Sequence, residues 1–109
     1  MNSTLIGVAA GLGLAVGAAG SDALAGPSVS TKWSETTLNL ERCKTRAESA
    51  VRDAGFRGVK VLQFSVFGER GDYSAMVRCA TDKGLVYFVV AGPQVDRTNR
   101  YVENIGEGF

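Results

Sequence analysis

The sequence contains no histidine among its 109 residues. This absence excludes Ser-His-Asp and Cys-His catalysis, imidazole metal ligands and a pH switch based on histidine. The aspartates fall singly along the chain, never in the D-x-D-x-D-G spacing of a calcium loop. We therefore expect no catalytic residues, no metal site and no cofactor in this protein.

The chain also lacks any block of like charge. Its 12 Lys and Arg residues are interspersed with 11 Asp and Glu residues, which leaves a formal net charge of +1. Nucleic acids and anionic membrane surfaces attract proteins through clustered positive charge. We therefore expect no nucleic-acid partner.

The N-terminal segment lacks charged side chains over residues 5–20. This apolar run is shorter than the roughly 20 residues that a membrane-spanning helix needs. The small residues of Ala23-Leu24-Ala25 then match the A-x-A pattern of a signal-peptide cleavage site. We predict a signal peptide over residues 1–25, cleaved after Ala25, and one exported domain over residues 26–109, in the periplasm or outside the cell and without a permanent membrane anchor. Because the first four residues include neither Lys nor Arg, a retained anchor, a misassigned start and a flexible tail stay open as alternatives.

Cysteine occurs only twice, with no C-x-x-C motif. Residues 40–54 carry apolar side chains at helical spacing after a good N-cap, Asn39, so we predict a helix whose apolar stripe includes Cys43. Residues 72–80 alternate as a strand does, which places Cys79 on the apolar face. An even cysteine count in a small exported chain favours a disulfide between the two, with buried free thiols or a redox-active pair as alternatives.

The remaining pattern is mostly β-strand. Strands are predicted over residues 29–38, 58–68, 72–80 and 85–91. Pro93 then begins a short C-terminal helix. The order β-α-β-β-β-α indicates an α+β two-layer sandwich, with one long helix packed on a mostly antiparallel four-stranded sheet. The C-terminal helix either shares the covered face or caps an end.

Two of the predicted strands are apolar on both faces, although one helix covers only one face of a sheet. We take as the candidate interaction face the set Leu62, Phe64, Val66, Val86, Phe88 and Val90. The opposite faces of the same strands carry Val59, Val61, Phe67, Leu85, Tyr87 and Val89. The uncovered face would receive the C-terminal helix, meet a second copy of the chain or bind an apolar or peptide ligand.

Residues 63–68, QFSVFG, resemble the Gln-x-Val-x-Gly loop motif of the cystatin protease inhibitors, with one extra residue between Gln63 and Val66. Cystatins also lay one helix across an antiparallel sheet. The chain departs from that family because its only tryptophan, Trp33, lies in the first strand and because the predicted fold ends in a helix. The resemblance implies protease inhibition as an alternative function, without family membership.

These features predict a non-enzymatic exported domain that binds another protein, an apolar or peptide ligand, or a second copy of itself as a homodimer. The alternative is a small exported enzyme or a protease-inhibitor-like protein. An enzyme would need polar groups converging in one cleft, such as two carboxylates or a carboxylate beside an arginine.

Overall fold

The computed structural model describes residues 26–109, so the predicted signal peptide over residues 1–25 lies outside the described residues. Strands dominate the described chain, and a helix follows the first strand and the last. The elements in chain order are strand β2 (Ser28–Glu35), helix α3 (Leu40–Asp53), strands β3 (Arg57–Val61), β4 (Ser65–Arg70) and β5 (Tyr73–Ala80), a 3-10 turn η1 (Thr81–Lys83), strand β6 (Leu85–Gly92) and helix α4 (Val95–Gly108).

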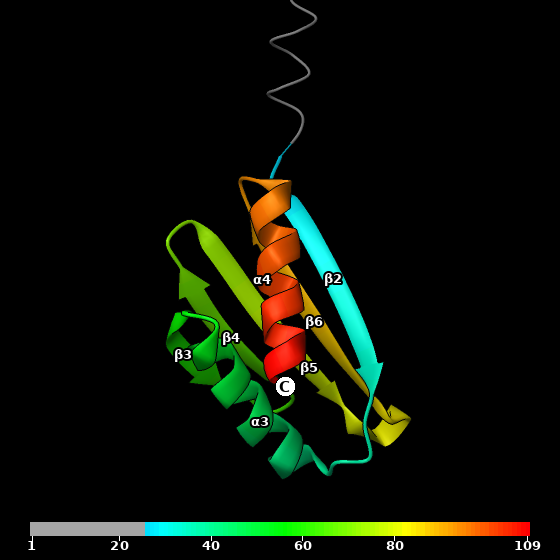
Figure 1. Ribbon diagram of the computed structural model, residues 1–109. Coiled ribbons are helices and arrows are strands. Elements are labelled where there is room, and N and C mark those ends of the chain that lie inside the picture. Colours follow the sequence, from blue (N-terminus) through cyan, green and yellow to red (C-terminus); the bar gives the residue numbers. More distant parts are fainter. Residues whose placement is uncertain (1–25) are drawn as a thin grey trace, which may run out of the picture.

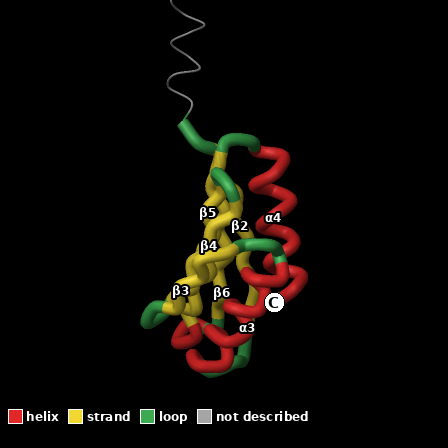
Figure 2. Tube along the Cα trace, turned by 90° about the vertical axis from the view of Figure 1, so that its left-hand side faces the viewer, coloured by secondary structure: helices red, strands yellow, loops and turns green. Residues whose placement is uncertain are grey.

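The five strands form one antiparallel sheet in the order β2-β6-β5-β4-β3. Both helices lie on the same face of this sheet, α4 across β2 and β6 and α3 across β3, β4 and β5 (Figure 1). A view turned by 90° shows the two layers, with the sheet on one side and the helices on the other (Figure 2). The α+β class predicted from the sequence is confirmed, while the number of strands is not.

The fifth strand arises because the predicted strand over residues 58–68 is two strands. The chain turns over at residues 62–64, where the Leu62 N–H donates to the Ser65 carbonyl oxygen at 2.8 Å, and β3 and β4 pair as a hairpin. No glycine or proline marks this turn, and apolar residues continue through it. The sequence pattern therefore contains no signal that residues 58–68 form two strands.

Helix α3 packs very close to the sheet. The Asn39 side chain accepts a hydrogen bond from the Arg42 N–H at 2.9 Å and caps the helix, as its sequence position predicts. The buried face of the helix consists of small residues, Cys43, Ala47, Ala50 and Val51. Opposite them, Gly68 of β4 is also buried, and a Cβ atom at that position would lie 2.7 Å from a Val51 methyl group. The short distance between helix and strand thus depends on a missing side chain.

Helix α4 is longer than the short helix that the sequence predicts, and it equals α3 in length at 14 residues. Its buried residues are Thr98, Tyr101, Val102 and Ile105. The Tyr101 ring packs edge-on against both Phe56 and Tyr73, with centroid distances of 5.7 and 5.2 Å. Aromatic contacts of this kind hold α4 over the sheet beside α3, so the C-terminal helix shares the covered face.

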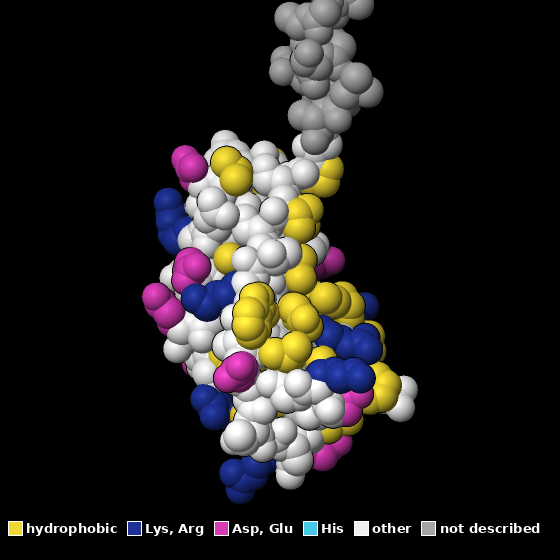
Figure 3. Space-filling view, turned by 90° about the vertical axis from the view of Figure 1, so that its right-hand side faces the viewer, with side chains coloured by type: hydrophobic (Ala, Val, Ile, Leu, Met, Phe, Trp, Pro, Cys, Tyr) yellow, Lys and Arg dark blue, Asp and Glu magenta, His cyan; other side chains and the backbone are white. Residues whose placement is uncertain are grey.

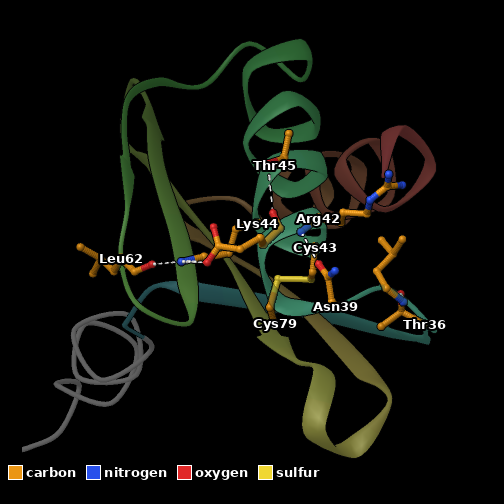
Figure 4. The surroundings of a disulfide bond; sticks show 10 residues. Thr36, Asn39, Arg42, Cys43, Lys44, Thr45, Leu62 and Cys79 are labelled. Atoms are coloured by element: carbon orange, nitrogen blue, oxygen red, sulfur yellow. Dashed lines mark hydrogen bonds and ion pairs between the residues drawn. A yellow bond between two sulfur atoms is a disulfide. The ribbon is translucent and has the colours of Figure 1, made fainter.

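A disulfide bond joins Cys43 of α3 to Cys79 of β5 (Figure 4). Both residues are fully buried in the core, their Cα atoms are 6.1 Å apart, and 36 positions separate them in the sequence. Closing a loop of this length lowers the entropy of the unfolded chain, which stabilises the fold by about 4 kcal/mol. The bond therefore ties the first helix to the middle strand of the sheet.

Candidate functional site

The six residues of the predicted interaction face do not lie on one surface in the structure. Four of its members, Val66, Val86, Phe88 and Val90, are fully buried beneath the helices and form part of the core. Leu62 and Phe64 are 52% and 40% exposed at the turn between β3 and β4. The prediction therefore assigned the wrong face of strands β4 and β6 to the ligand. The side chains one position along each strand, such as Phe67 and Tyr87, point away from the helices.

The uncovered side of the sheet, called here the open face, is defined by strand register. Cys79, Val77 and Ala75 of β5 point into the core, and their neighbours in the chain point away from the helices. Following the paired residues outward across the sheet gives the members of the open face: Val29, Thr31, Trp33 and Glu35 of β2; Leu85, Tyr87, Val89 and Ala91 of β6; Ser74, Met76, Arg78 and Ala80 of β5; Ser65, Phe67 and Glu69 of β4; and Lys60 of β3.

Two rows of this face carry its largest side chains. In the first row, Trp33 lies opposite Tyr87, and Tyr87 lies opposite Arg78. The second row runs across all five strands as Thr31, Val89, Met76, Phe67 and Lys60. Since neighbouring strands are about 4.8 Å apart, this row extends roughly 19 Å. The centre of the open face is therefore a continuous apolar and aromatic band.

The aromatic side chains of this band are accessible. Trp33 is 58% exposed, Tyr87 41% and Phe67 37%. Figure 3 views the molecule from the β2 side and shows hydrophobic side chains gathered along it, with Lys and Arg side chains next to them. Exposed aromatic residues on neighbouring strands form a surface of the kind that proteins use for recognition.

Charged groups lie at the β3–β4 end of the apolar band. The Arg78 guanidinium lies 5.3 Å from the centre of the Phe64 ring, so it is stacked on an aromatic side chain at the margin of the face. Lys60, Glu69 and Ser74 line an open depression beside Phe67, together with Gly58 and Gly68. Both signs of charge are thus available to the polar groups of a ligand at this end of the open face.

The described residues offer little for chemistry elsewhere. Between Gly26 and Phe109, no three Cys, Asp or Glu side chains gather closely enough to hold a metal ion. Glu69 does share a depression with Arg57 and Arg70. However, Arg70 donates to the Ala54 carbonyl oxygen at 2.8 Å and stacks over the Tyr101 ring at 4.5 Å. Through these contacts Arg70 connects the end of α3 to the side of α4. This structural role explains the position of the arginine without a catalytic function.

The segment that resembles the cystatin motif does not form an exposed loop. Gln63 and Phe64 lie in the turn between β3 and β4, whereas Val66 and Gly68 lie inside strand β4 and are buried. The Lys44 ammonium group of α3 donates to the Leu62 carbonyl oxygen at 3.4 Å, which links this turn to the helix (Figure 4). A valine packed under α3 is inaccessible to a protease cleft.

Neither helix in the described part of the chain has the length and apolar character needed to cross a membrane. Known protein families and curated proteins give no match to this sequence. The assignment of a function therefore depends on the open face and its residues.

Trp33, Tyr87 and Phe67 were absent from the predicted interaction face, although one signal in the sequence points to them. Cys79 pairs with a cysteine on a helix, so the face of β5 that holds Cys79 must be the covered one. The short connection to β6 places Val86 opposite Cys79, which directs Tyr87 to the other side. The cysteine pair therefore carries the information about which face is open.

Proposed function

We propose that this protein is an exported, non-enzymatic binding domain whose open face docks an apolar segment of a peptide or of another protein. The uncovered band that contains Trp33, Tyr87 and Phe67 is the observation that carries the proposal. Trp and Tyr are enriched among the residues that contribute most to binding energy, because they bury a large area at a small cost in side-chain entropy.

The proposed ligand is an extended segment because of the shape of the site. The band crosses five strands in a line, and its depression at Lys60 and Phe67 is open to solvent. A small apolar molecule is bound best where most of its surface is enclosed. A segment lying across the strands would instead contact the aromatic rows along its length and place its polar groups at Lys60 and Glu69.

The proposed location outside the cytoplasm has two supports. A disulfide in a domain of this size is typical of proteins that fold in an oxidising compartment. The apolar N-terminal run followed by Ala23-Leu24-Ala25 has the pattern of a cleaved leader. The mass of the protein purified from its host tests both, because cleavage after Ala25 and loss of two hydrogens on disulfide formation each change it.

A selection from a phage-displayed library of random dodecapeptides tests the binding proposal. The wild-type protein should enrich peptides with two or more large apolar residues, and the double variant Trp33→Ala/Tyr87→Ala should lose at least tenfold in affinity for them. Val95→Ala is the matched control, since Val95 is also an exposed hydrophobic residue but begins α4, away from the open face. Enriched peptides that bind the double variant as tightly as the wild type would contradict the proposal.

A further inference from the structure

The two edge strands of the sheet differ in how well they are protected against pairing with another strand. Edge strands of natural proteins are usually short, bulged, or marked by charge or proline. Strand β3 fits this rule, because it has five residues, a register shift and a positive-φ Gly58. Strand β2 has eight residues in unbroken register with β6, and no glycine or proline interrupts it. Its two charged residues leave the middle of this edge open, because Lys32 pairs with Glu103 of α4 and Glu35 is the last residue of the strand. Within residues 26–109, no segment pairs with its outer side.

The outer side of β2 presents backbone groups at alternate residues. The Thr36 N–H donates to the Gly84 carbonyl oxygen at 2.9 Å, in continuation of the β2–β6 register. In an antiparallel pair such bonds alternate, so residues of the same parity as Thr36 face β6. The N–H and C=O groups of Val29, Thr31 and Trp33 therefore point away from the sheet and are available to another strand.

The side chains of the same residues are unusually exposed. Val29 is 59% exposed and Trp33 is 58% exposed, the two highest values among the large hydrophobic side chains that the structure describes. Both lie on the open face, with Thr31 midway between them. An edge strand that carries two exposed hydrophobic side chains and free backbone groups resembles one half of a strand pair.

We propose that β2 pairs in antiparallel fashion with β2 of a second copy of this chain, with Thr31 opposite Thr31 of the second copy. This register places Val29 of each copy opposite Trp33 of the other. Pairs of an aromatic with a β-branched residue, and of two threonines, are among the favourable cross-strand contacts. Because these are the residues whose backbone groups point outward, each of the three pairs would exchange two N–H···O bonds.

Charge disfavours the neighbouring register that is centred on Lys32. Lys32 points to the helix side, where its ammonium group lies 2.8 Å from Glu103 of α4, and in the proposed pairing it falls opposite Ser30 of the second copy. A register centred on Lys32 would set two lysines directly opposite each other, which is unfavourable. The proposed pairing would join two five-stranded sheets edge to edge and place their open faces side by side.

A cysteine cross-linking experiment on the full chain tests both the dimer and its register. Thr31→Cys should form a covalent dimer under mild oxidation, because its Cα would lie about 5.5 Å from its counterpart, which a disulfide can span. Val29→Cys alone should cross-link at least tenfold more slowly, while an equimolar mixture of Val29→Cys and Trp33→Cys should give the mixed dimer. Equal rates for Thr31→Cys and Val29→Cys would overturn the register.

Sedimentation equilibrium provides the second measurement. The wild type should show a reversible dimer at micromolar to submillimolar concentration, and Thr31→Pro should be monomeric with an unchanged circular dichroism spectrum, since the lost N–H makes no bond to β6. A wild type that is monomeric throughout this range would overturn the proposal, as would a Thr31→Pro variant that still dimerises. Peptide binding by the wild type, measured at protein concentrations at which it is monomeric, separates this outcome from the fate of the proposed function, which does not depend on dimerisation.

Discussion

The two helices cover the same face of the sheet but are attached to it in different ways. Helix α3 is joined to β5 by the Cys43–Cys79 disulfide, and its alanines pack closely against Gly68 of β4. Helix α4 has no covalent link and includes polar contacts, in which the Thr98 and Ser30 hydroxyl oxygens are 2.7 Å apart and Lys32 pairs with Glu103. The α3 side of the molecule thus depends on constraint and shape, with side-chain hydrogen bonds to Leu62 and Ala54 only at its exposed margins. The α4 side adds a buried hydrogen bond to its apolar packing.

The largest effect should follow from removing the covalent link. The double variant Cys43→Ala/Cys79→Ala should lower the free energy of unfolding by about 4 kcal/mol, because the unfolded chain regains the entropy that the closed loop removed. Urea denaturation monitored by circular dichroism measures the change. The wild type unfolded in the presence of a thiol reductant is the matched control and should lose a similar amount. A loss below about 1 kcal/mol would mean that packing alone holds α3 in place.

A methyl group added under each helix should sharpen the comparison. Gly68→Ala should destabilise the fold by about 1–3 kcal/mol, because the new Cβ would meet the buried Val51 and Phe56 side chains. Gly106→Ala should be neutral or stabilising by up to about 1 kcal/mol, since alanine favours a helix and the nearby Lys32 side chain is flexible enough to move. Thermal unfolding should show a lower midpoint for Gly68→Ala and an unchanged or higher midpoint for Gly106→Ala. Equal destabilisation by both would contradict the proposed difference in packing.

The smallest effects are expected from the polar contacts of α4. Thr98→Val keeps the shape of a fully buried side chain but removes a hydroxyl shared with Ser30 and the Val95 carbonyl oxygen, so stability should fall by about 1 kcal/mol. Glu103→Gln should cost less than about 0.5 kcal/mol, because its ion pair with Lys32 is largely exposed to solvent. Urea denaturation at low and high salt separates the two effects. Only the Glu103 effect should shrink as salt screens the charges, and a salt-dependent loss for Thr98→Val would contradict this assignment.

The sequence was sufficient to predict the α+β class and the start of α3. The N-cap at Asn39 and the regular spacing of small apolar residues are local signals, and they identify the helix without reference to the rest of the fold. The division of the run over residues 58–68 was missed because its turn contains no residue that favours positive φ or breaks a strand. The length of α4 was underestimated because Gly106 and Gly108 are poor helix formers, and tertiary packing overrides that preference.

The open face could be inferred only in part. Alternation along β6 shows that residues of one parity share a face, but both parities are apolar, so alternation alone does not decide which face the helices cover. That decision is a property of the assembled fold. The cysteine pair connects a helix to one face of β5, and from there the strand register determines the orientation of every neighbouring strand.

The exposed position of Trp33 has a consequence for spectroscopy. Because it is the only tryptophan in the chain and projects from the edge strand into solvent, indole emission excited at long wavelength should already resemble that of the unfolded polypeptide. In the monomer, tryptophan fluorescence should therefore change little when the core melts. The same signal should shift to the blue whenever another molecule covers this indole, which makes the native residue a label for encounters at the surface.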